Sequence, residues 1–270
     1  MAKIAGVVCA AGYSMIGCLP KVLLTVAGVP MVCRVVRALR HGGLDPRMVA
    51  VVVNPSSGPQ ICSALERHSC GDCIRVVQPD RRGSADAALR ALPYLREHGA
   101  DSFILAYADM PLWRPETISR LVSEHQAGDA VVTMVTVPIT SEMPKGLMRY
   151  GHVLRDKSGG IVDIAEPGEV GSGELSEADT VNPSLWAWEI EWFLEHAEIT
   201  PPFPKRDGRS PELRIPPLVA LAYREGALIK ELSLEDPSEA LGVNTAEELD
   251  IVREIAESRS SAVLSVLVET

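Results

Sequence analysis

Short runs of apolar, often β-branched residues alternate with amphipathic segments along the first half of the chain. Runs that end at glycine or asparagine in this way are typical of parallel strands buried on both faces. The segments between them space their apolar residues three and four positions apart, as helices do. The pattern predicts strands over 4–12, 48–54, 73–79, 101–111 and 129–137, and helices over 30–44, 59–70, 83–99 and 114–128.

The second half of the chain is less regular. A hairpin is predicted around a Ser-Gly-Gly turn, and the last helix carries a capping box, in which Thr245 caps the helix and Glu248 reaches back to it. A segment rich in proline and charge, 199–217, is expected to be a loop over the ligand cleft or partly disordered. The remaining expectations are a hairpin over 152–167, a strand running into a helix over 180–198, a helix over 217–227, a strand over 228–237, a helix over 245–259 and a short strand or frayed tail over 260–270.

Alternating strands and helices predict an α/β fold with a doubly wound, mostly parallel sheet, right-handed crossovers and an elaborated C-terminal half. In such sheets the ligand lies beyond the carboxyl ends of the strands. No internal repeat divides the chain. We therefore expect a single domain over residues 1–258, followed by a tail over 259–270.

The charge balance is acidic, since 26 lysines and arginines against 36 aspartates and glutamates give a formal net charge of −10. This argues against nucleic acid or an anionic membrane as a partner, because both need basic surface. The chain has no apolar window of the length of a membrane span, about 18 residues, and its N-terminus lacks the pattern of a signal peptide. We expect a cytoplasmic protein whose six cysteines are reduced thiols.

Neither the cysteines nor the histidines of the sequence form a recognisable site. Cys70 and Cys73 make a single CxxC without a second pair, which disfavours zinc. No Ser/His/Asp arrangement can be identified. The histidines are interpreted as surface residues: His41, His68, His98, His125, His152 and His196.

The first segment with candidate chemistry is CAAGYSMIGCLPK, residues 9–21, at the end of the first predicted strand. Small residues such as Ala11 and Gly12 let a bound group approach the backbone, and amides at such a turn can hold phosphate. Lys21 adds a mobile point charge for the same anion. Taken alone, the segment is better explained as an ordinary strand–helix loop, because the spacing of a P-loop is absent.

Polar residues at other strand ends change this interpretation. Asp109 follows a buried strand, where a carboxylate is well placed for Mg²⁺, and Asn244 offers a carbonyl oxygen to the same ion. Gln78 ends another strand, and its amide can both donate to and accept from a base edge. Glu166 and Asn182 each end an apolar run and suit the recognition of sugar hydroxyls. Each of these residues alone is explained equally well by a turn or a helix cap.

Taken in order, seven segments resemble the sugar-phosphate nucleotidyltransferases, and most closely the N-terminal uridyltransferase domain of the bacterial N-acetylglucosamine-1-phosphate uridyltransferases. The resemblance covers roughly residues 3–255. It implies a Rossmann-like α/β domain of the nucleotide-diphospho-sugar transferase type. The segments are VVCAAGYSMIGCLPKVLLTVAGVPM, VVQPDRRGSADAA, AYADMPL, YGHVLRD, IAEP, TVNPSL and EALGVNTAEEL.

The resemblance also implies a reaction, in which a sugar 1-phosphate attacks the α-phosphorus of a nucleoside triphosphate, with UTP favoured, and pyrophosphate leaves. Such catalysis is mainly positioning and electrostatics. The partners are then small molecules, and a homo-oligomer is left open. The implied roles are nucleotide binding by Ala11, Gly12, Lys21, Gln78, Gly83 and Ser84, magnesium binding by Asp109 and Asn244, catalysis by Lys21 and Asp109, and sugar binding by Gly151, Glu166 and Asn182. Ser84 is also expected to cap the helix that follows it.

The sequence departs from the family pattern in its first motif. The family loop runs Ala-Ala-Gly-x-Gly-Thr-Arg-Met before Pro-Lys, whereas this loop is about two residues shorter and has no arginine. That arginine stabilises the triphosphate, and losing such a contact costs several kcal/mol of transition-state stabilisation, to order of magnitude. Arg81 and Arg82 are candidates to replace it.

A second departure concerns the acceptor, because Glu212 is kept but Pro217 stands where the family often has an acid. The hexapeptide repeats of the acetyltransferase domain are also absent, so that second activity is not expected.

Two alternatives to a sugar-phosphate nucleotidyltransferase stay open. One is an enzyme like the molybdenum-cofactor cytidylyltransferases, which share the Ala-Ala-Gly-x-Ser opening and an Asp-Met-Pro after a central strand. The other is a catalytically weakened homologue that binds a nucleotide or a sugar phosphate without transferring it. Turnover with CTP and a pterin would favour the first, and binding of a triphosphate without turnover would favour the second.

Overall fold

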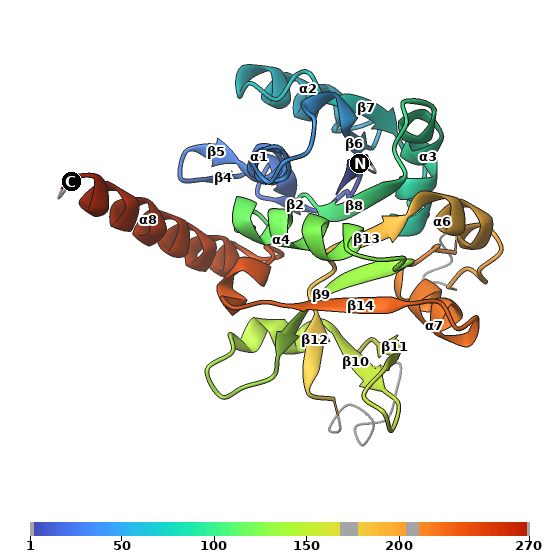
Figure 1. The fold of residues 1–270 in the computed structure, drawn as a ribbon. Coiled ribbons are helices and arrows are strands. Elements are labelled where there is room, and N and C mark those ends of the chain that lie inside the picture. Colours follow the sequence, from blue (N-terminus) through green and yellow to red (C-terminus); the bar gives the residue numbers. More distant parts are fainter. Residues whose placement is uncertain (1–2, 168–177, 204–210, 269–270) are drawn as a thin grey trace.

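The structure, a computed structural model, describes residues 3–167, 178–203 and 211–268. Within these residues a ten-stranded mixed sheet runs through the molecule, with helices packed on both of its faces (Figure 1). The strand order is β11-β10-β12-β9-β13-β8-β1-β6-β7, and β14 also pairs with β9. Among the helices of these residues, none combines the length and the apolar character needed to cross a membrane.

Six strands of the sheet have a parallel partner, because β1 pairs in parallel with β6 and β8, β6 with β7, and β14 with β9. A seventh strand, β13 (Trp186–Glu189), lies antiparallel between β8 and β9. The prediction of a mostly parallel α/β sheet is therefore confirmed. The six strands are β1 (Ile4–Ala10), β6 (Val49–Val53), β7 (Ile74–Val77), β8 (Ser102–Tyr107), β9 (Val132–Pro138) and β14 (Ile229–Ser233).

The C-terminal half extends the sheet with short antiparallel strands. The predicted hairpin is confirmed as β10 (Gly151–Arg155) and β11 (Ile161–Ala165), and β12 (Thr180–Asn182) joins it to the end of β9. The segment predicted as one strand running into a helix contains two strands, β12 and β13. Pro183 and Ser184, the latter with a φ of +60°, interrupt the ladder between them.

Helices cover both faces of the sheet because the central strands are apolar on both sides. In β1, Val8 and Ala10 pack in one core with α1, while Ala5 and Val7 pack in the other core with α3. This explains why the strand appears as a continuous apolar run rather than an alternating one. The helices of the first core are α1 (Met31–His41), α2 (Gly58–Arg67) and α4 (Pro115–Gln126), and those of the second are α3 (Ser84–Glu97), α6 (Ile190–Ala197) and α7 (Pro216–Arg224).

Several short elements complete the fold. Two small hairpins follow β1, and in the described part of the chain four 3₁₀ helices connect longer elements. The hairpins are β2 (Met15–Ile16) with β3 (Leu19–Pro20) and β4 (Thr25–Val26) with β5 (Val29–Pro30); the 3₁₀ helices are η1 (Lys21–Leu23), η2 (Pro46–Met48), η3 (Lys145–Arg149) and η4 (Pro237–Ala240).

The last helix, α8 (Ala246–Val268), extends away from the sheet toward the C-terminus (Figure 1). Its predicted capping box is confirmed, because the Glu248 amide donates to Thr245 Oγ1 at 3.2 Å and the Thr245 amide donates to Glu248 Oε2 at 3.3 Å. The short strand or frayed tail predicted after residue 259 is wrong up to Val268, where the helix ends.

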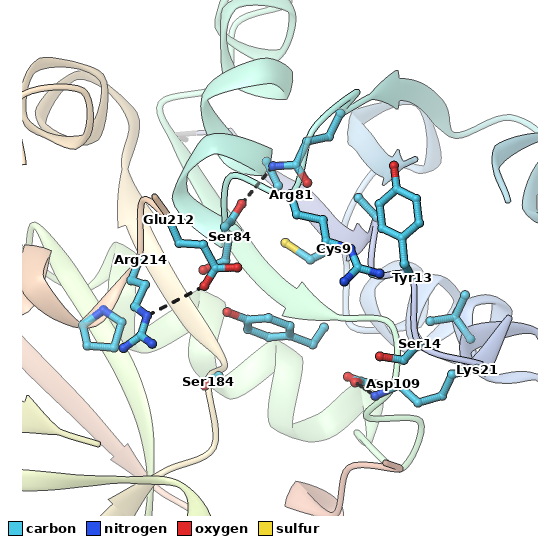
Figure 2. Close-up of a pocket in the computed structure, with 18 of the residues that line it drawn as sticks. Cys9, Tyr13, Ser14, Lys21, Arg81, Ser84, Asp109, Ser184, Glu212 and Arg214 are labelled. Atoms are coloured by element: carbon cyan, nitrogen blue, oxygen red, sulfur yellow. Dashed lines mark hydrogen bonds and ion pairs between the residues drawn. The ribbon is translucent and has the colours of Figure 1, made fainter. Parts of the chain in front are cut away.

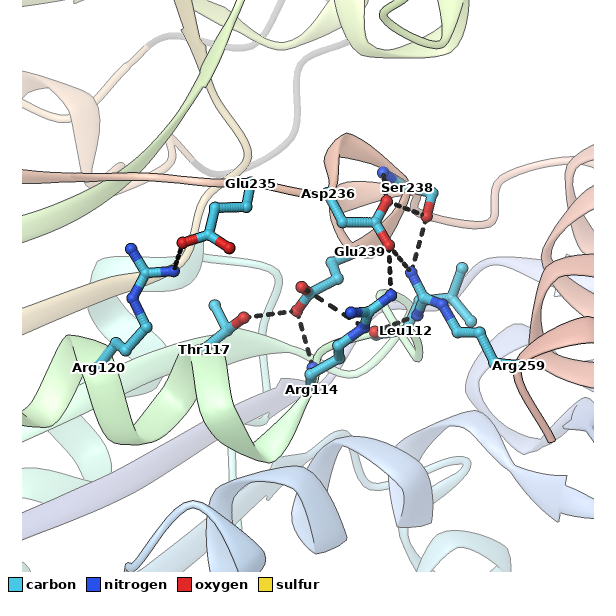
Figure 3. A network of polar contacts seen from close by, with 9 residues as sticks. All are labelled: Leu112, Arg114, Thr117, Arg120, Glu235, Asp236, Ser238, Glu239 and Arg259. Atoms are coloured by element: carbon cyan, nitrogen blue, oxygen red, sulfur yellow. Dashed lines mark hydrogen bonds and ion pairs between the residues drawn. The ribbon is translucent and has the colours of Figure 1, made fainter. Parts of the chain in front are cut away.

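Arg259 anchors this helix to the body of the protein, as Figure 3 shows. Its guanidinium donates to the Leu112 carbonyl at 2.9 Å, to Asp236 Oδ2 at 2.9 Å and to Ser238 Oγ at 2.7 Å. The neighbouring Glu239 accepts from Thr117 Oγ1 at 2.8 Å. These bonds tie α8, α4 and the segment after β14 together, so the first turns of α8 have a fixed position.

Two histidines that were predicted to lie on the surface are buried. His125 is 4% exposed and His152 is 2% exposed. His125 Nδ1 lies 3.0 Å from Thr133 Oγ1, and His152 Nδ1 lies 3.1 Å from the Tyr150 carbonyl. The prediction failed because a helical or loop position alone does not say which face packs against the sheet.

Stability should fall between pH 7 and pH 5 because of His125. Burial, helped by the charge of Lys230, lowers the pKa of His125 to about 4, while an unfolded histidine titrates near pH 6.5. Below that pH the unfolded state binds a proton that the folded state rejects, so stability is lost as the pH falls, by about 2 kcal/mol at pH 5. In urea unfolding, the free energy of unfolding of H125Q should not show this loss between pH 7 and pH 5. The exposed-histidine variant H98Q should show it as the unmodified protein does. A loss that persists in H125Q would show that His125 is not its cause.

Candidate functional site

A cavity of about 540 Å³ lies at the carboxyl ends of β1 and β8 (Figure 2). This is the edge of the sheet where ligands bind in open α/β folds. The loops after β1, β7 and β8 and the segment before α7 contribute side chains to it. Eight of the predicted site residues line the cavity: Ala11, Gly12, Lys21, Gln78, Gly83, Ser84, Asp109 and Glu166.

Lys21 joins two segments that are far apart in the sequence. Its ammonium donates to Asp109 Oδ2 at 2.6 Å and to Asn244 Oδ1 at 2.8 Å. The lysine side chain is only 9% exposed, so it is not the mobile point charge that the sequence suggested. Its backbone amide also donates to the Ser14 carbonyl at 2.9 Å, which closes the loop after β1. The cavity therefore has a fixed cation in its lining.

The position of Asn244 depends on α8 and on Tyr150. The Asn244 amide donates to Glu248 Oε2 at 2.6 Å, and the amide of Val243 donates to the Asp109 carbonyl at 3.0 Å. The Tyr150 hydroxyl donates to the carbonyl of Ala240 at 2.9 Å, and burial raises the pKa of this phenol, which keeps it protonated. The capping box thus also orients Asn244, a predicted metal ligand. Tyr150 supports the segment that precedes Asn244, a role that the sequence did not reveal.

Asn54 holds the loop after β1 and was missed as a functional residue. It is fully buried at the end of β6, and its Nδ2 donates to the carbonyls of Ala11 at 3.3 Å and Gly12 at 3.1 Å. Its Oδ1 accepts from the Ser57 amide at 2.8 Å. Because both ends of the Asn54 side-chain amide are hydrogen-bonded, Asn54 holds the backbone of the predicted nucleotide loop in place. The only sequence signal was a polar residue directly after a buried strand.

The side-chain amide of Gln78 is oriented by a buried carboxylate. Both hydrogens of its Nε2 are used, one by the Gly83 carbonyl at 2.9 Å and one by Asp86 Oδ2 at 2.8 Å. Asp86 is 5% exposed and also pairs with Arg90 at 2.8 Å. Because a carboxylate can only accept hydrogen bonds, Nε2 and Oε1 of Gln78 cannot exchange places. Gln78 therefore offers a ligand the acceptor Oε1 and no free donor. No pattern in the sequence indicates this role for Asp86.

Gly83 and not Ser84 caps α3. Ser84 is the first residue of the helix and makes no capping hydrogen bond, so the predicted cap is wrong. Gly83 takes the capping position with a φ of +94°, which glycine adopts without strain. Its neighbour Ala85 donates its amide to the Leu213 carbonyl at 3.1 Å, so the segment before α7 packs directly on the start of α3.

G83A is expected to displace this contact and to weaken nucleotide binding. A Cβ at residue 83 would lie 2.3 Å from the Leu213 carbonyl oxygen, and alanine is strained at this φ by about 1–3 kcal/mol. The matched control is G159A, since Gly159 has a φ of +87° and open space around it. Urea unfolding and calorimetric UTP binding are measured for both variants, because both carry the backbone strain and only G83A also overlaps Leu213. Equal effects of G83A and G159A on UTP binding would contradict this interpretation.

The cavity lining also includes Glu166, Glu212 and Arg214, and Figure 2 shows Glu212 and Arg214 on the side away from Lys21. The Arg214 guanidinium lies 3.7 Å above the centre of the Phe203 ring, and its Nε is 3.9 Å from Glu212 Oε2. The loop predicted to cover the cleft therefore contributes at least Glu212 and Arg214 to its wall. Part of that loop, 204–210, lies outside the described residues.

Two residues assigned to sugar binding lie outside the cavity lining. Asn182 is 2% exposed, donates from Nδ2 to the Val135 carbonyl at 2.9 Å and accepts at Oδ1 from the Ser184 amide at 3.0 Å. Gly151 is its partner in the β10–β12 pair, and a Cβ there would lie 2.4 Å from a methyl carbon of Ile164 and 3.3 Å from Glu166 Oε1. Both residues support the strands that carry Glu166, and their contact with a sugar stays a prediction.

Asp109 and Asn244 are the residues that could hold a metal ion. Mg²⁺ prefers oxygen ligands, takes one or two from protein carboxylates and completes its octahedral shell with substrate phosphates and water. The donor set fits that ion. The described residues contain no cluster of three or more His, Cys, Asp or Glu side chains suited to a metal held by protein alone.

None of the described residues that line the cavity is an activated nucleophile. Cys9 lines it, but burial and the nearby Asp109 charge raise the pKa of its thiol to about 12, so the reactive thiolate is absent at neutral pH. Burial also raises the pKa of Tyr107. The arrangement therefore suits a direct transfer between two bound substrates rather than a covalent enzyme intermediate.

Known proteins similar to this chain indicate its family. A model of the MobA-like NTP transferase domain matches residues 6–156. The chain belongs to this family. The nucleotidyltransferase family predicted from the sequence is thereby confirmed, and the matched residues include those from β1 to β10 that supply Lys21, Gln78 and Asp109.

Curated relatives of this NTP transferase are bifunctional GlmU proteins. The protein from Pelobacter propionicus is 30% identical over 252 residues, which are 92% of this chain and 51% of the relative. The protein from Carboxydothermus hydrogenoformans is 29% identical over 241 residues, which are 88% and 50% of the two chains. The chain thus spans about half the length of the relatives it matches.

Two solved structures share the fold of this NTP transferase. One is CMP:2-keto-3-deoxy-manno-octonic acid synthetase complexed with CTP, with a TM-score of 0.67 at 20% identity over 96% of this chain and 100% of that chain. The other is a putative glucose-1-phosphate thymidylyltransferase from Bacillus anthracis, with a TM-score of 0.67 at 14% identity over 94% and 95% of the two chains. The expected Rossmann-like nucleotidyltransferase fold is confirmed.

Proposed function

We propose that this protein is a Mg²⁺-dependent nucleotidyltransferase that joins UTP to a sugar 1-phosphate and releases pyrophosphate. The observation that carries the proposal is the contact of the Lys21 ammonium with both Asp109 and Asn244, at the edge of a cavity beyond the carboxyl ends of β1 and β8. A fixed cation beside two oxygen ligands is what a triphosphate and its metal ion require.

In the proposed reaction a phosphate oxygen of the acceptor forms a bond to the α-phosphorus of UTP. The bond between that phosphorus and the oxygen bridging to the β-phosphate breaks, and pyrophosphate leaves with the electron pair. Lys21 stabilises the negative charge on the phosphoryl oxygens, while the backbone around Gly12 lets the phosphates approach. A bound Mg²⁺, held by Asp109 and Asn244, would supply further charge neutralisation. The protein then acts mainly by positioning the two substrates.

The orientation of Gln78 supports UTP as the nucleotide. Its Nε2 is fully used by Gly83 and Asp86, so Oε1 can only accept a hydrogen bond from the base. Uracil presents an N–H donor at ring position 3, whereas cytosine presents a lone pair at the same position. An acceptor at that position favours uracil. The same argument weighs against a cytidylyltransferase.

Support for a sugar 1-phosphate as the acceptor comes from the far wall of the cavity. The carboxylates of Glu166 and Glu212 line the cavity and are hydrogen-bond acceptors suited to hydroxyl groups. Glu212 lies across the cavity from Lys21 (Figure 2). The resemblance of the sequence to the N-acetylglucosamine-1-phosphate uridyltransferases adds the expectation of a hexosamine phosphate. Arg214 adds a positive charge to this wall, suited to a phosphate of the acceptor.

A substrate panel tests the proposal. The protein is incubated with Mg²⁺, each of the four nucleoside triphosphates and a set of sugar 1-phosphates, and pyrophosphate release is followed. Turnover with UTP and a hexosamine 1-phosphate is expected, with CTP at least about tenfold slower, the factor of one hydrogen bond. Turnover only with CTP and a pterin would replace the proposal with the cytidylyltransferase. Triphosphate binding in calorimetry without any turnover would replace it with a binding protein.

A further inference from the structure

Three cationic side chains line the cavity, and their partners differ. Lys21 is paired with Asp109 at 2.6 Å, and the Arg214 Nε lies 3.9 Å from Glu212 Oε2. Arg81 makes no ion pair and no hydrogen bond with any residue that the structure describes. It is nevertheless partly buried and faces the cavity. A guanidinium that lines the cavity without a carboxylate partner among the described residues is available for an anionic ligand.

Tyr13 fixes the direction of this guanidinium. The Arg81 Cζ lies 4.2 Å from the centre of the Tyr13 ring, a cation–π distance. The Tyr13 hydroxyl in turn donates to the Pro79 carbonyl at 3.4 Å. Figure 2 shows the Arg81 side chain passing Cys9 to reach Tyr13, on the side of the cavity where Lys21 and Asp109 lie. The loop after β1 and the loop after β7 thus meet through this pair.

We propose that Arg81 binds the phosphate chain of the nucleoside triphosphate beyond its α-phosphate, and that Tyr13 is the positioning residue for its guanidinium. A planar guanidinium binds phosphate oxygens through two parallel hydrogen bonds, which an ammonium cannot do. The loop after β1 has no arginine of its own. Arg81 brings this group to the same phosphates from the β7–α3 loop instead. The inference rests on the proposed nucleotidyl transfer and names the residue that holds the leaving pyrophosphate.

Arg82, the other candidate from the sequence, does not have this geometry. Its side chain is 48% exposed, and its Nε lies 3.7 Å from Asp86 Oδ1 on the helix side of the loop. It does not line the cavity. Asp86 keeps its closer partner Arg90 at 2.8 Å whether or not Arg82 is present. Arg82 is therefore a matched control in the same loop.

The test compares the binding of UTP and UMP by calorimetry in the presence of Mg²⁺. R81A should weaken UTP binding about 10- to 100-fold, the loss of one or two charged hydrogen bonds, and should change UMP binding less than about twofold. R81K should recover only part of the loss. Y13L, which removes the ring, should weaken UTP binding by roughly threefold and change UMP binding less than about twofold. R82A should bind both nucleotides normally.

Two outcomes would overturn the inference. In one, R81A binds UTP as tightly as the unmodified protein; in the other, R81A loses UTP and UMP to the same extent, so that Arg81 serves the loop or the base. Thermal unfolding of each variant shows whether it is folded. Failure of the unmodified protein to bind any nucleotide is a different result, because it removes the proposed function itself.

Discussion

D109N is expected to reduce pyrophosphate release by about 100- to 1,000-fold at saturating Mg²⁺ and UTP. The substitution removes the carboxylate charge of the proposed metal site. It also leaves the ammonium of Lys21, whose side chain is 9% exposed, without a counter-charge. Breaking a partly buried pair from one side costs stability, of the order of 3 kcal/mol. The loss of turnover and the loss of stability have the same cause, the missing negative charge of Asp109.

Pyrophosphate release and urea unfolding of the same samples separate the two effects of D109N. The matched control is D129N, since Asp129 is exposed and precedes β9 at the opposite, amino end of that strand. It should retain full turnover and stability. Metal-dependent turnover in a folded D109N sample within about tenfold of the unmodified protein would show that the assignment of the metal ligand is wrong.

K21M is expected to change turnover and metal binding in opposite directions. Turnover should fall by about 100-fold or more, because no other ammonium contacts the described residues at this point of the cavity. Mg²⁺ binding to the nucleotide-free protein should become tighter. The ammonium now bonded to Asp109 and Asn244 takes up the same oxygens that the metal ion needs, and methionine removes this competition without a large change in volume.

Calorimetric titration with MgCl₂ alone measures this second effect of K21M. The exposed-lysine variant K157M, in the hairpin turn between β10 and β11, changes the net charge equally and should bind Mg²⁺ as the unmodified protein does. Unchanged or weaker Mg²⁺ binding in K21M would contradict a shared set of oxygens. It would leave Lys21 as a phosphate ligand with no part in the metal site.

The location of the site could be predicted from the sequence because it depends on local patterns. A β-branched run that ends in small residues predicts a buried parallel strand, and parallel strands bring their carboxyl ends to one edge of the sheet. This reasoning placed Lys21 and Asp109 at that edge, and both line the cavity there. The capping box of Thr245 and Glu248 is equally local, and it places Asn244 at the same edge.

Contacts made between distant segments could not be predicted. Nothing in the sequence indicates that Asp86 orients the Gln78 amide or that Asn54 holds the loop above it, because each depends on how a helix or strand packs against its neighbour. Asn182 illustrates the limit. Its place at the end of an apolar run suggested a sugar ligand, but whether its amide faces a ligand or the Val135 carbonyl is decided by the adjacent strand β9.

The bond between Lys21 and Asn244 spans 223 residues of the chain, and this has a consequence for synthesis. While the protein emerges from the ribosome, β1 and β8 can pair long before Asn244 and its supporting Glu248 have been made. Until then the Lys21 ammonium lacks one of its two oxygen partners, and the proposed metal site lacks one of its two ligands. Catalytic competence should therefore arise late and abruptly, when the first turn of α8 docks.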